Sequence, residues 1–549
     1  MVTQDFANST RQLIDSLKNI CAAYGLGNDG NEFKIITQVF LYKFLNDKFA
    51  FEAKKIKPEL AQDQDSAESW EQAISALSDD ELEMLQLQMG PDTARLKPEH
   101  FIAHLFGRQN VPEFAKLFDD TLRDIAISNN DIFAVKTDGG AKVILFDRVS
   151  EYISDVGKRD AFCRAIINKL VEFSFERIFT QKFDFYATIF EYLIKDYNSN
   201  SGGKYAEYYT PHAVARIMAA ILVPQDQQGK VQNVSCYDPS AGSGSLLMNV
   251  AHAIGESRCS IYTQDISQKS SNLLRLNLIL NNLVHSIPNI IQGNTLLHPY
   301  HRDGKALKRF DYIVSNPPFK MDFSDFRNEL ETKENKDRFF AGVPKVPAKA
   351  KEKMAIYQLF LQHIVHSLKP GGKAAVVVPT GFITAQSGID KKIRQHLVDE
   401  KMLAGVVSMP SNIFATTGTN VSILFIDDSN KNGVVLIDAS GLGTKVKDGK
   451  NQKTLLSEAE ENHITASFNA KEAVEDFSVV VSYDEIAAKN YSLSAGQYFE
   501  VKIEYMDLTP EQFTTKMKGF TDNLDKLFKA SAGLEQEIRK QLAGLNYEV

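Results

Sequence analysis

The chain has 549 residues, of which 43% are hydrophobic and 24% are charged, and its formal net charge is −8. This length exceeds what one hydrophobic core usually supports and predicts two or three domains. Because phosphate contacts by Lys and Arg supply most non-specific affinity for nucleic acid, an acidic chain indicates either another class of substrate or a partner that carries the positive charge.

The sequence shows no signal for a membrane or a secreted protein. No apolar run reaches the roughly 18 residues of a spanning helix, and Met1 to Asp5 lack the basic stretch and apolar core of a signal peptide. We therefore expect a cytoplasmic protein without membrane association. The cysteines lack C-x-x-C spacing, which predicts ordinary buried thiols and no metal or disulfide framework; they are Cys21, Cys163, Cys236 and Cys259.

Residues 6–178 show helical periodicity, with apolar residues three and four positions apart. Helices are expected over 114–127 and 159–173, among others, and a polar, acidic stretch over 62–83 interrupts them. We predict an α-helical N-terminal domain over residues 1–178. Its apolar stripes are expected to form core or protein interface rather than a cofactor site.

A helix is expected over 183–197, and the polar, glycine-containing residues 198–203 are typical of a flexible linker. The next motif reads Glu207-Tyr208-Tyr209-Thr210-Pro211-His212 and precedes a periodic run over 213–222. Thr210 fits the N-cap of this helix and Pro211 its first position. Taken alone, the two tyrosines are read as packing residues.

A strand is predicted over 231–237, followed by the turn Asp238-Pro239-Ser240-Ala241-Gly242-Ser243-Gly244-Ser245 and a helix over 246–254. This order is typical of the start of a nucleotide-binding α/β domain, because glycines admit a ligand close to the backbone and the helix offers free N–H groups. The third glycine of the dinucleotide fingerprint and the Lys-Ser/Thr pair of a phosphate loop are missing. The turn therefore favours an adenosyl ligand without a pyrophosphate.

Two more predicted strands end in polar residues. The strand over 259–264 leads to Asp265, at about the spacing where an acidic residue meets a ribose hydroxyl. The strand over 290–292 leads to Gly293 and Asn294, where a side chain could meet an adenine amino group. Helices over 273–281, 355–368 and 391–401 and strands over 312–315, 373–379, 405–409 and 421–426 complete a largely parallel sheet, with its site at the carboxyl ends of the strands.

The strand over 312–315 runs into Asn316-Pro317-Pro318-Phe319. Two prolines in succession stop the sheet and hold the preceding residue extended. The Asn316 side-chain oxygen and the Pro317 carbonyl could then accept hydrogen bonds from one planar amino group, with Phe319 stacked on the ring that bears it. Two acceptors help to localise the nitrogen lone pair, which indicates methyl transfer to an amine. In isolation the motif also fits a plain strand-to-loop turn with Phe319 in the core.

Two segments have two interpretations each. The polar residues 321–353 are either a solvated loop or a loop that closes over a phosphate backbone, because they carry Lys345, Lys349, Lys351 and Lys353. From Thr509 onward the chain is predicted to be helical, and a coiled-coil-like stripe is formed by Phe513, Met517, Phe520, Leu524, Leu527, Leu534, Ile538 and Leu545. Such stripes are often intramolecular core, but a long terminal one favours a partner helix.

In this order, the motifs at 207–211, 238–244 and 316–319 resemble those of amino-group DNA methyltransferases. The chain is similar to the modification subunits of Type I restriction-modification systems, which are adenine-N6 DNA methyltransferases. The resemblance covers nearly the whole chain. It implies an α/β fold, with a Rossmann-like S-adenosylmethionine-dependent methyltransferase domain over 179–495 and C-terminal helices over 496–549 that contact a specificity subunit.

The resemblance implies S-adenosylmethionine as methyl donor, without a metal. Its binding residues would be Glu207, Tyr208, Tyr209, Thr210, Pro211, His212, Ser240, Ala241, Gly242, Ser243, Gly244, Asp265 and Asn294. The catalytic residues would be Asn316, Pro317, Pro318 and Phe319, which would hold the N6 amino group of an adenine rotated out of the duplex. Proximity and orientation would supply most of the rate. Asn294 departs from the family, in which Asp commonly follows the glycine, although its amide oxygen can still accept.

The chain lacks an obvious target-recognition domain, since the region after Val421 is too short for one once the terminal helices are assigned. The resemblance implies double-stranded DNA as substrate, a specificity subunit that reads it, two modification subunits per specificity subunit, and a restriction subunit that can join the complex. An Asn-Pro-Pro-aromatic motif also suits a protein glutamine or an RNA adenine, and such methyltransferases remain the alternatives. A non-enzymatic scaffold would be expected to have a damaged motif, and here it is intact.

Overall fold

The computed structural model describes residues 2–27, 30–61, 70–176, 179, 210–414, 420–448, 451–499 and 509–543. The chain divides into two compact units, Met1–Tyr498 and Phe499–Val549. In the second unit the described element is helix α19 (Pro510–Ala543), as the C-terminal periodicity predicts. Among the described helices, none is both long enough and apolar enough to span a membrane.

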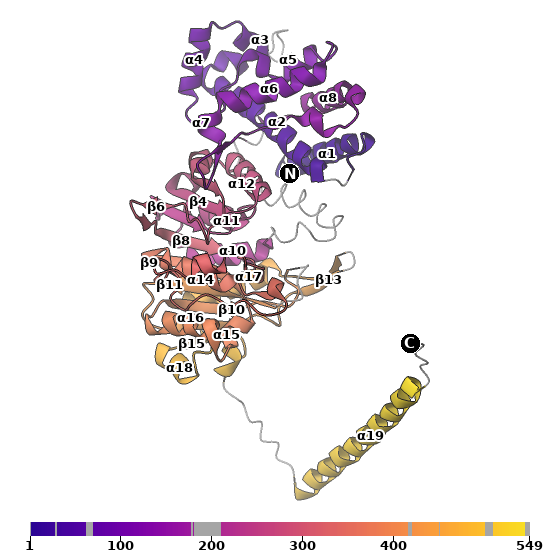
Figure 1. Ribbon diagram of the computed structural model, residues 1–549, viewed down its shortest axis with the longest axis vertical. Helices are drawn as coiled ribbons and strands as arrows, with labels where there is room; N and C mark the ends of the chain where they lie inside the picture. The colour runs from indigo at the N-terminus through magenta and orange to yellow at the C-terminus, as the bar shows by residue number, and fades with distance from the viewer. Residues whose placement is uncertain are drawn as a thin grey trace. The chain divides into compact units, whose positions relative to one another are not determined.

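The first part of unit 1 is a bundle of helices (Figure 1). Within it, Trp70 and Phe49 both pack on the ring of Phe101, with ring centroids 4.9 and 5.5 Å away. Part of the polar stretch over 62–83 is helical as well, because Ser78 and Glu81 form a capping box. The helices are α1 (Val2–Ala23), α2 (Gly30–Ile56), α3 (Trp70–Ser75), α4 (Asp79–Gln88), α5 (Ile102–Gly107), α6 (Phe114–Ser128), α7 (Asn130–Phe133) and α8 (Val156–Val171).

This region also contains a hairpin that the helical periodicity did not predict. Strands β1 (Val135–Thr137) and β2 (Lys142–Val143) pair in antiparallel fashion, and β1 pairs in parallel with β5 (Ile290–Gln292). Strands of two and three residues are too short for an alternating pattern to be recognised. Because β1 pairs with β5, the hairpin extends the sheet of the α/β region.

The central sheet has the order β15-β12-β10-β11-β9-β8-β3-β4-β5-β1-β2. From β1 to β9, neighbouring strands in this order are parallel, whereas β11 is antiparallel to both of its neighbours. The strands are β3 (Val234–Asp238), β4 (Cys259–Asp265), β8 (Phe310–Ser315), β9 (Leu368–Pro379), β10 (Leu403–Ser408), β11 (Val421–Asp427), β12 (Val434–Asp438) and β15 (Ser478–Val481). The strand order reverses between β3 and β8, and in open α/β sheets ligands bind at such a point, beyond the carboxyl ends of the strands.

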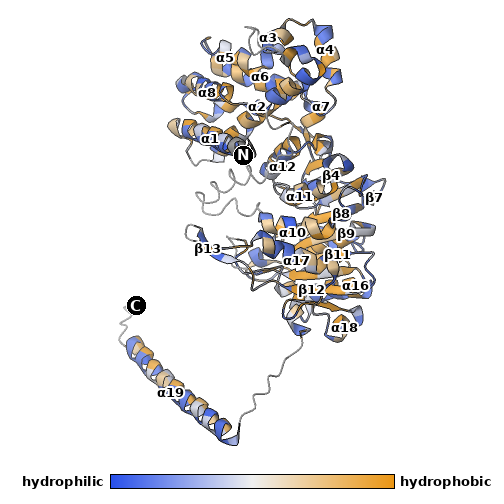
Figure 2. Ribbon diagram, turned by 180° about the vertical axis from the view of Figure 1, so that it is seen from behind, coloured by the Kyte–Doolittle hydropathy of each residue, from blue (hydrophilic) through white to orange (hydrophobic). Residues whose placement is uncertain are grey.

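Helices cover the sheet, whose strands are mostly apolar (Figures 1 and 2). Helix α10 packs on α11 and α17, while α16 contacts α14 and α18. Most of the predicted elements are present with ends shifted by a few residues. The helices are α10 (His212–Leu222), α11 (Ser245–Ile254), α12 (Gln268–Leu280), α14 (Tyr357–His366), α15 (Gly381–Thr384), α16 (Gly388–Asp399), α17 (Glu458–Ala470) and α18 (Tyr483–Ala488).

Strand β9 begins earlier than predicted. Residues 369–372, which precede the strand expected over 373–379, lie within it, where Gly371 has a φ of +74° and the pairing register with β8 shifts. The sequence did not predict the elements between β11 and α19, including β12, β15, α17, α18 and a separate hairpin formed by β13 (Thr444–Asp448) and β14 (Asn451–Leu455). Another unpredicted hairpin pairs β6 (Arg302–Asp303) with β7 (Ala306–Leu307).

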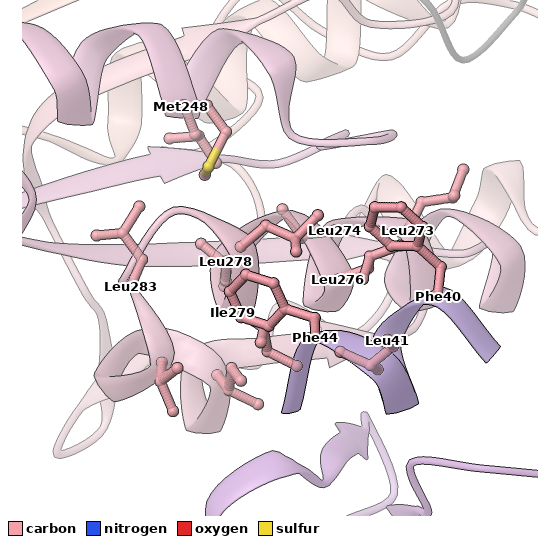
Figure 3. Packing of buried hydrophobic residues seen from close by; sticks show 14 of the residues in the cluster. Phe40, Leu41, Phe44, Met248, Leu273, Leu274, Leu276, Leu278, Ile279 and Leu283 are labelled. Carbon is pink, nitrogen blue, oxygen red and sulfur yellow. The ribbon is translucent and has the colours of Figure 1, made fainter. Parts of the chain in front are cut away.

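The helical bundle and the α/β region share one hydrophobic core. Phe40, Leu41 and Phe44 of α2 lie beside Leu276 and Ile279 of α12 (Figure 3). Residues 177–178 and 180–209 lie outside the described residues, as do the helix and linker expected there, so the domain boundary at 178 stays a prediction.

Arg275 of α12 also joins the two regions. Its side chain is buried and donates to the carbonyls of Phe133, Val143, Ile144 and Leu145 at 3.0 to 3.3 Å. Burial lowers the pKa of this guanidinium to about 10. These bonds fix the β1–β2 hairpin and its flanking residues against α12.

The polar segment 321–353 has a small core of its own. Phe323, Leu330, Phe339 and Val343 pack on residues of α14 and on Leu296. The segment contains the short helix α13 (Arg327–Leu330), and the buried Arg338 donates to the carbonyls of Thr295 and Leu296 at 2.8 and 2.7 Å. It is therefore anchored underneath, while Lys345, Lys349, Lys351 and Lys353 stay exposed.

Candidate active site

The turn after β3 and the motif after β8 meet at the point where the strand order reverses. Ser315 donates from Oγ to Asp238 Oδ1 at 2.9 Å, and the hydroxyl oxygens of Ser315 and Ser240 lie 2.7 Å apart. The Ser240 N–H also donates to Asp238 Oδ1 at 2.9 Å. These bonds join the predicted cofactor turn to the strand that leads into Asn316.

Asp238 is the buried acceptor at this junction. Burial raises the pKa of its carboxyl to about 7, and the negative charge of Asp265 adds to the rise, while the hydrogen bonds from Ser240 and Ser315 lower it. The protonated form of this carboxyl is therefore favoured more than in an exposed aspartate. The sequence analysis placed Asp238 in the turn but gave it no role of its own.

Asn316 is half-buried at the end of β8, and its amide is oriented by the residue before α10. Its Nδ2 donates to Thr210 Oγ1 at 3.2 Å. With the amide nitrogen engaged in this way, Oδ1 is the atom left to accept from a substrate amino group. The segments 210–212 and 316–319, far apart in sequence, are therefore brought together.

The predicted N-cap role of Thr210 is wrong. Helix α10 begins at His212 with Pro211 in the cap position, and no side chain caps it. The Thr210 hydroxyl instead accepts from Asn316. Pro211 is buried and His212 is the first helical residue. Glu207, Tyr208 and Tyr209 lie outside the described residues.

Phe319 is partly exposed next to Asn316. Its ring packs edge-to-face on Tyr357, with centroids 6.1 Å apart and an interplanar angle of 72°. The Tyr357 hydroxyl donates to Asp390 Oδ1 at 2.8 Å, which fixes the ring. Pro317 is buried and Pro318 partly exposed. Sequence reasoning missed Tyr357, since an aromatic residue at the start of a helix carries no distinguishing signal.

The turn 240–244 is held from two sides. Asn277 of α12 donates to the Ser243 carbonyl at 2.6 Å, and Thr295 donates to the Pro239 carbonyl at 2.7 Å. Gly244 has a φ of +82°, and a Cβ there would lie 2.2 Å from Leu274 Cδ1. A larger residue would push the turn away from α12, so the glycine keeps the turn packed against that helix.

Asp265 lies at the end of β4, beside this turn. Its Oδ2 accepts from the Gly242 N–H at 2.9 Å and its Oδ1 accepts from the Ser267 N–H at 2.8 Å. Burial raises the pKa of this carboxyl. Each oxygen has a second lone pair, so a ribose hydroxyl can still bind, and the ribose role stays a prediction.

Two neighbouring residues alter the picture drawn from the sequence. Asn294 Oδ1, the expected acceptor for the cofactor adenine, accepts from the N–H groups of Leu296 and Leu297 at 3.0 and 3.2 Å. Ile266, which the sequence analysis did not single out, is 64% exposed directly after Asp265. An apolar side chain exposed at this edge offers a surface on which a purine can lie.

The cysteines are buried and free, as predicted, at Cys21, Cys163, Cys236 and Cys259. Within the described ranges, no group of three or more His, Cys, Asp or Glu side chains is placed to hold a metal ion.

Comparison with known proteins gives a family and several relatives. The family model for N-6 DNA methylase matches residues 181–506, more than half of the chain. A Type I restriction enzyme methylase subunit of Mycoplasma pneumoniae is 29% identical over 367 residues, which are 65% of this chain and 63% of that protein. One from Methanocaldococcus jannaschii is 28% identical over 400 residues, or 70% and 67% of the two chains. The chain therefore spans about two thirds of the length of these relatives.

Two solved structures share the fold. A type I restriction-modification methyltransferase subunit from Streptococcus thermophilus has a TM-score of 0.68 at 21% identity, covering 90% of this chain and all of that chain. A chain from a study of complex assembly in a type I system has a TM-score of 0.52 at 18% identity, covering 98% and 99%. The resemblance drawn from the three motifs is confirmed by the family match and by these relatives, and the chain belongs to the N-6 DNA methylase family.

Proposed function

We propose that this chain is the DNA adenine-N6 methyltransferase subunit of a Type I restriction-modification complex and takes its methyl group from S-adenosylmethionine. The observation that carries the proposal is the hydrogen-bonded junction that brings the turn 240–244, Thr210 and Asn316 to one point of the sheet. A methyl donor and an acceptor amine must meet at such a point. We expect the protein to act in the cytoplasm, where chromosomal DNA of a bacterium or archaeon lies.

The residues around the turn fit an adenosyl cofactor. Gly242 and Gly244, which have positive φ angles, carry no side chain and so leave the backbone uncovered, and Ile266 offers an apolar surface beside the Asp265 carboxylate. When bound, S-adenosylmethionine supplies a methyl group on a sulfonium, which is a good leaving group. The residues proposed to hold it are those at 207–212 and 240–244, with Asp265 and Asn294.

On the substrate side, Asn316 Oδ1 and the Pro317 carbonyl accept the two N6 hydrogens of a flipped-out adenine, and Phe319 stacks on the base. The two acceptors favour a tetrahedral nitrogen, whose lone pair then points at the methyl group. As the new N–C bond forms, the bond between the donor sulfur and the methyl group would break, and the methylated nitrogen would afterwards lose one proton to water. The edge-to-face contact with Tyr357 would keep Phe319 in place as the base enters.

Selection of the DNA site is assigned to a separate specificity subunit, joined by two copies of this chain, and a restriction subunit can join this complex. The proposed contact is α19, whose apolar stripe includes Phe513, Met517, Phe520, Leu524 and Leu527 (Figure 2). Within the described part of its own unit, no side chain of α19 is buried. A helix that exposes an apolar stripe of this length is typical of one half of a helix pair.

The test is transfer of radiolabelled methyl from S-adenosylmethionine to duplex DNA, with and without the protein encoded beside this one as a candidate specificity subunit. Label found as N6-methyladenine only with both proteins supports the proposal. Label on DNA with this chain alone would mean that it carries its own target recognition. Label on a protein or an RNA, and none on duplex DNA, would favour the glutamine or RNA alternative.

A further inference from the structure

The tip of the β1–β2 hairpin lies at the carboxyl edge of the sheet, beside the predicted cofactor residues. The Gly242 N–H donates to Asp265 Oδ2 at 2.9 Å, and the Asp265 carbonyl accepts from the Gly293 N–H at 2.9 Å. Next along the edge, the Gln292 carbonyl accepts from the Asp138 N–H, also at 2.9 Å. This series of hydrogen bonds runs from the glycine-rich turn, through β4 and β5, to a residue of the N-terminal region.

Gly293 brings Asp138 close to this edge. A Cβ at position 293 would lie 2.4 Å from Asp138 Oδ2 and 2.5 Å from Asp138 Cβ. Such distances are below any van der Waals contact, so only glycine leaves room for the Asp138 side chain at this place. The carboxylate is thus packed over the backbone that follows β5, where the sequence analysis expected the cofactor adenine.

The other oxygens at this edge are engaged. Asn294 Oδ1 accepts from two N–H groups, and the Asn294 carbonyl accepts from His298 at 2.8 Å. The carbonyls of Asp265 and Gln292 accept as described above. Asp138, by contrast, is exposed, and no other described residue donates a hydrogen bond to its carboxylate or forms an ion pair with it. The Asp138 carboxylate therefore has all its lone pairs available to accept hydrogen bonds next to Gly293.

We propose that Asp138 is a cofactor-binding residue, whose carboxylate accepts a hydrogen bond from the exocyclic amino group of the cofactor adenine. It supplies an acceptor where Asn294 Oδ1 is already engaged by two backbone N–H groups, and it comes from the N-terminal region rather than from the α/β region. This inference rests on the proposed use of S-adenosylmethionine. It makes the hairpin part of the cofactor site.

The test is calorimetric titration of the full chain with S-adenosylhomocysteine and with S-inosylhomocysteine, which carries an oxygen in place of the amino group. Wild type is expected to bind the adenosyl compound more tightly, since a carbonyl oxygen would face the carboxylate. Asp138→Ala should weaken binding of the adenosyl compound roughly tenfold, the lower end for a hydrogen bond to a charged group at an exposed site. Its binding of the inosyl compound should change much less, so the preference is lost.

Two further variants sharpen the result. Asp138→Asn keeps an oxygen acceptor and offers a donor to the inosyl oxygen, so it should bind the two compounds about equally. Asp92→Ala is the matched control, since Asp92 is also an exposed carboxylate of the N-terminal region, in the loop after α4. It should leave both affinities unchanged.

The titrations separate the role of Asp138 from the identity of the cofactor. Unchanged affinity of Asp138→Ala for S-adenosylhomocysteine, or an equal loss for both compounds, would overturn the assignment to the amino group. Failure of the wild type to bind S-adenosylhomocysteine would instead overturn the proposed cofactor, and the inference with it. A wild type that binds while Asp138→Ala behaves like Asp92→Ala would leave the proposed function standing and remove Asp138 alone.

Discussion

At the scale of single residues, the two polar atoms of the Asn316 side-chain amide have different partners, one in the protein and one expected in the substrate. Its nitrogen donates to Thr210, and its oxygen is left for the target amino group. Asn316→Ala should therefore retain cofactor affinity and lose methyl transfer by at least roughly a hundredfold, as when one positioned polar group is removed from a transition state. Cofactor titration and single-turnover transfer measure the two effects. Weakened cofactor binding with transfer retained would contradict the assigned roles.

The Thr210 hydroxyl is expected to act through Asn316. Thr210→Val removes the acceptor and keeps the shape of the side chain, so transfer should fall by roughly tenfold while the amide of Asn316 loses its orientation. Thr210→Ser restores the hydroxyl and should recover most of the rate. If the serine variant is as slow as the valine variant, packing rather than the hydrogen bond is what matters at this position.

Asp238 predicts a pH dependence of stability. Its pKa is about 7 in the folded chain against an ordinary value of 3.8, so between these values the folded state binds more protons than the unfolded state. The free energy of unfolding should therefore fall as the pH rises from about 4 to about 7. Asp238→Asn keeps the acceptor oxygen and should flatten this slope, as denaturant titrations at several pH values would measure. Equal slopes in both proteins would contradict the role of burial.

The sequence predicted where the motifs at 238–244 and 316–319 lie, because each follows a recognisable strand, while the roles of their residues stay predictions. It did not predict which hydrogen bonds those residues make. Asn294 and Thr210 were given partners that their chemistry allows, but nearby backbone or side-chain groups compete for the same atoms. Asp138 was missed because its importance depends on the pairing of β1 with β5, a contact between residues far apart in sequence.

At the scale of elements, the segment 321–353 shows why composition alone left two readings open. Its polar residues hide a small core that includes Phe323 and Phe339, and Arg338 fastens it to the loop after β5. The exposed lysines are therefore held on an anchored surface. The Met321 N–H donates to the Met354 carbonyl at 3.1 Å. This bond brings the end of the lysine-containing stretch close in space to the residues that follow the proposed catalytic motif.

These lysines are expected to bind the DNA backbone. Replacing Lys345, Lys349, Lys351 and Lys353 with Gln should weaken DNA binding by the assembled complex and reduce the salt slope by about 0.9 for each phosphate that is no longer neutralised. Replacement of the same four by Arg keeps the charge and serves as the control. An unchanged salt slope in the Gln variant would support the alternative of a solvated loop.

Helix α19 is expected to be needed for assembly and not for cofactor binding. Ending the chain at Leu508 should prevent formation of a complex with the specificity subunit, while titration with S-adenosylhomocysteine should be unaffected. The double change Leu524→Glu and Leu527→Glu should act alike, because it places charges in the apolar stripe. Thr515→Glu, on the opposite side of the helix, is its control. Size-exclusion chromatography with the partner distinguishes them, and a truncated chain that still assembles would remove the argument for the stripe.

At the scale of the whole of unit 1, one core joins the helical bundle to the sheet, and Arg275 completes the joint through four carbonyl groups. Arg275→Met should lower the free energy of unfolding by about 3 kcal/mol, because buried carbonyls lose charged donors. Denaturant unfolding followed by circular dichroism measures this. Arg539→Met, an exposed arginine on α19, should change it by less than about 0.5 kcal/mol.

The sheet that continues from β5 into β1 has a practical consequence for anyone who dissects the protein. Cutting the chain at the predicted boundary would strip β5 of its neighbour and leave the N–H and C=O groups of an apolar strand, with Ile290 and Ile291 beside them, open to pairing with another molecule. Open strands of this kind promote aggregation. We therefore expect a fragment beginning after residue 178 to be recovered from cells as insoluble aggregates, even though it retains every motif by which the family is recognised.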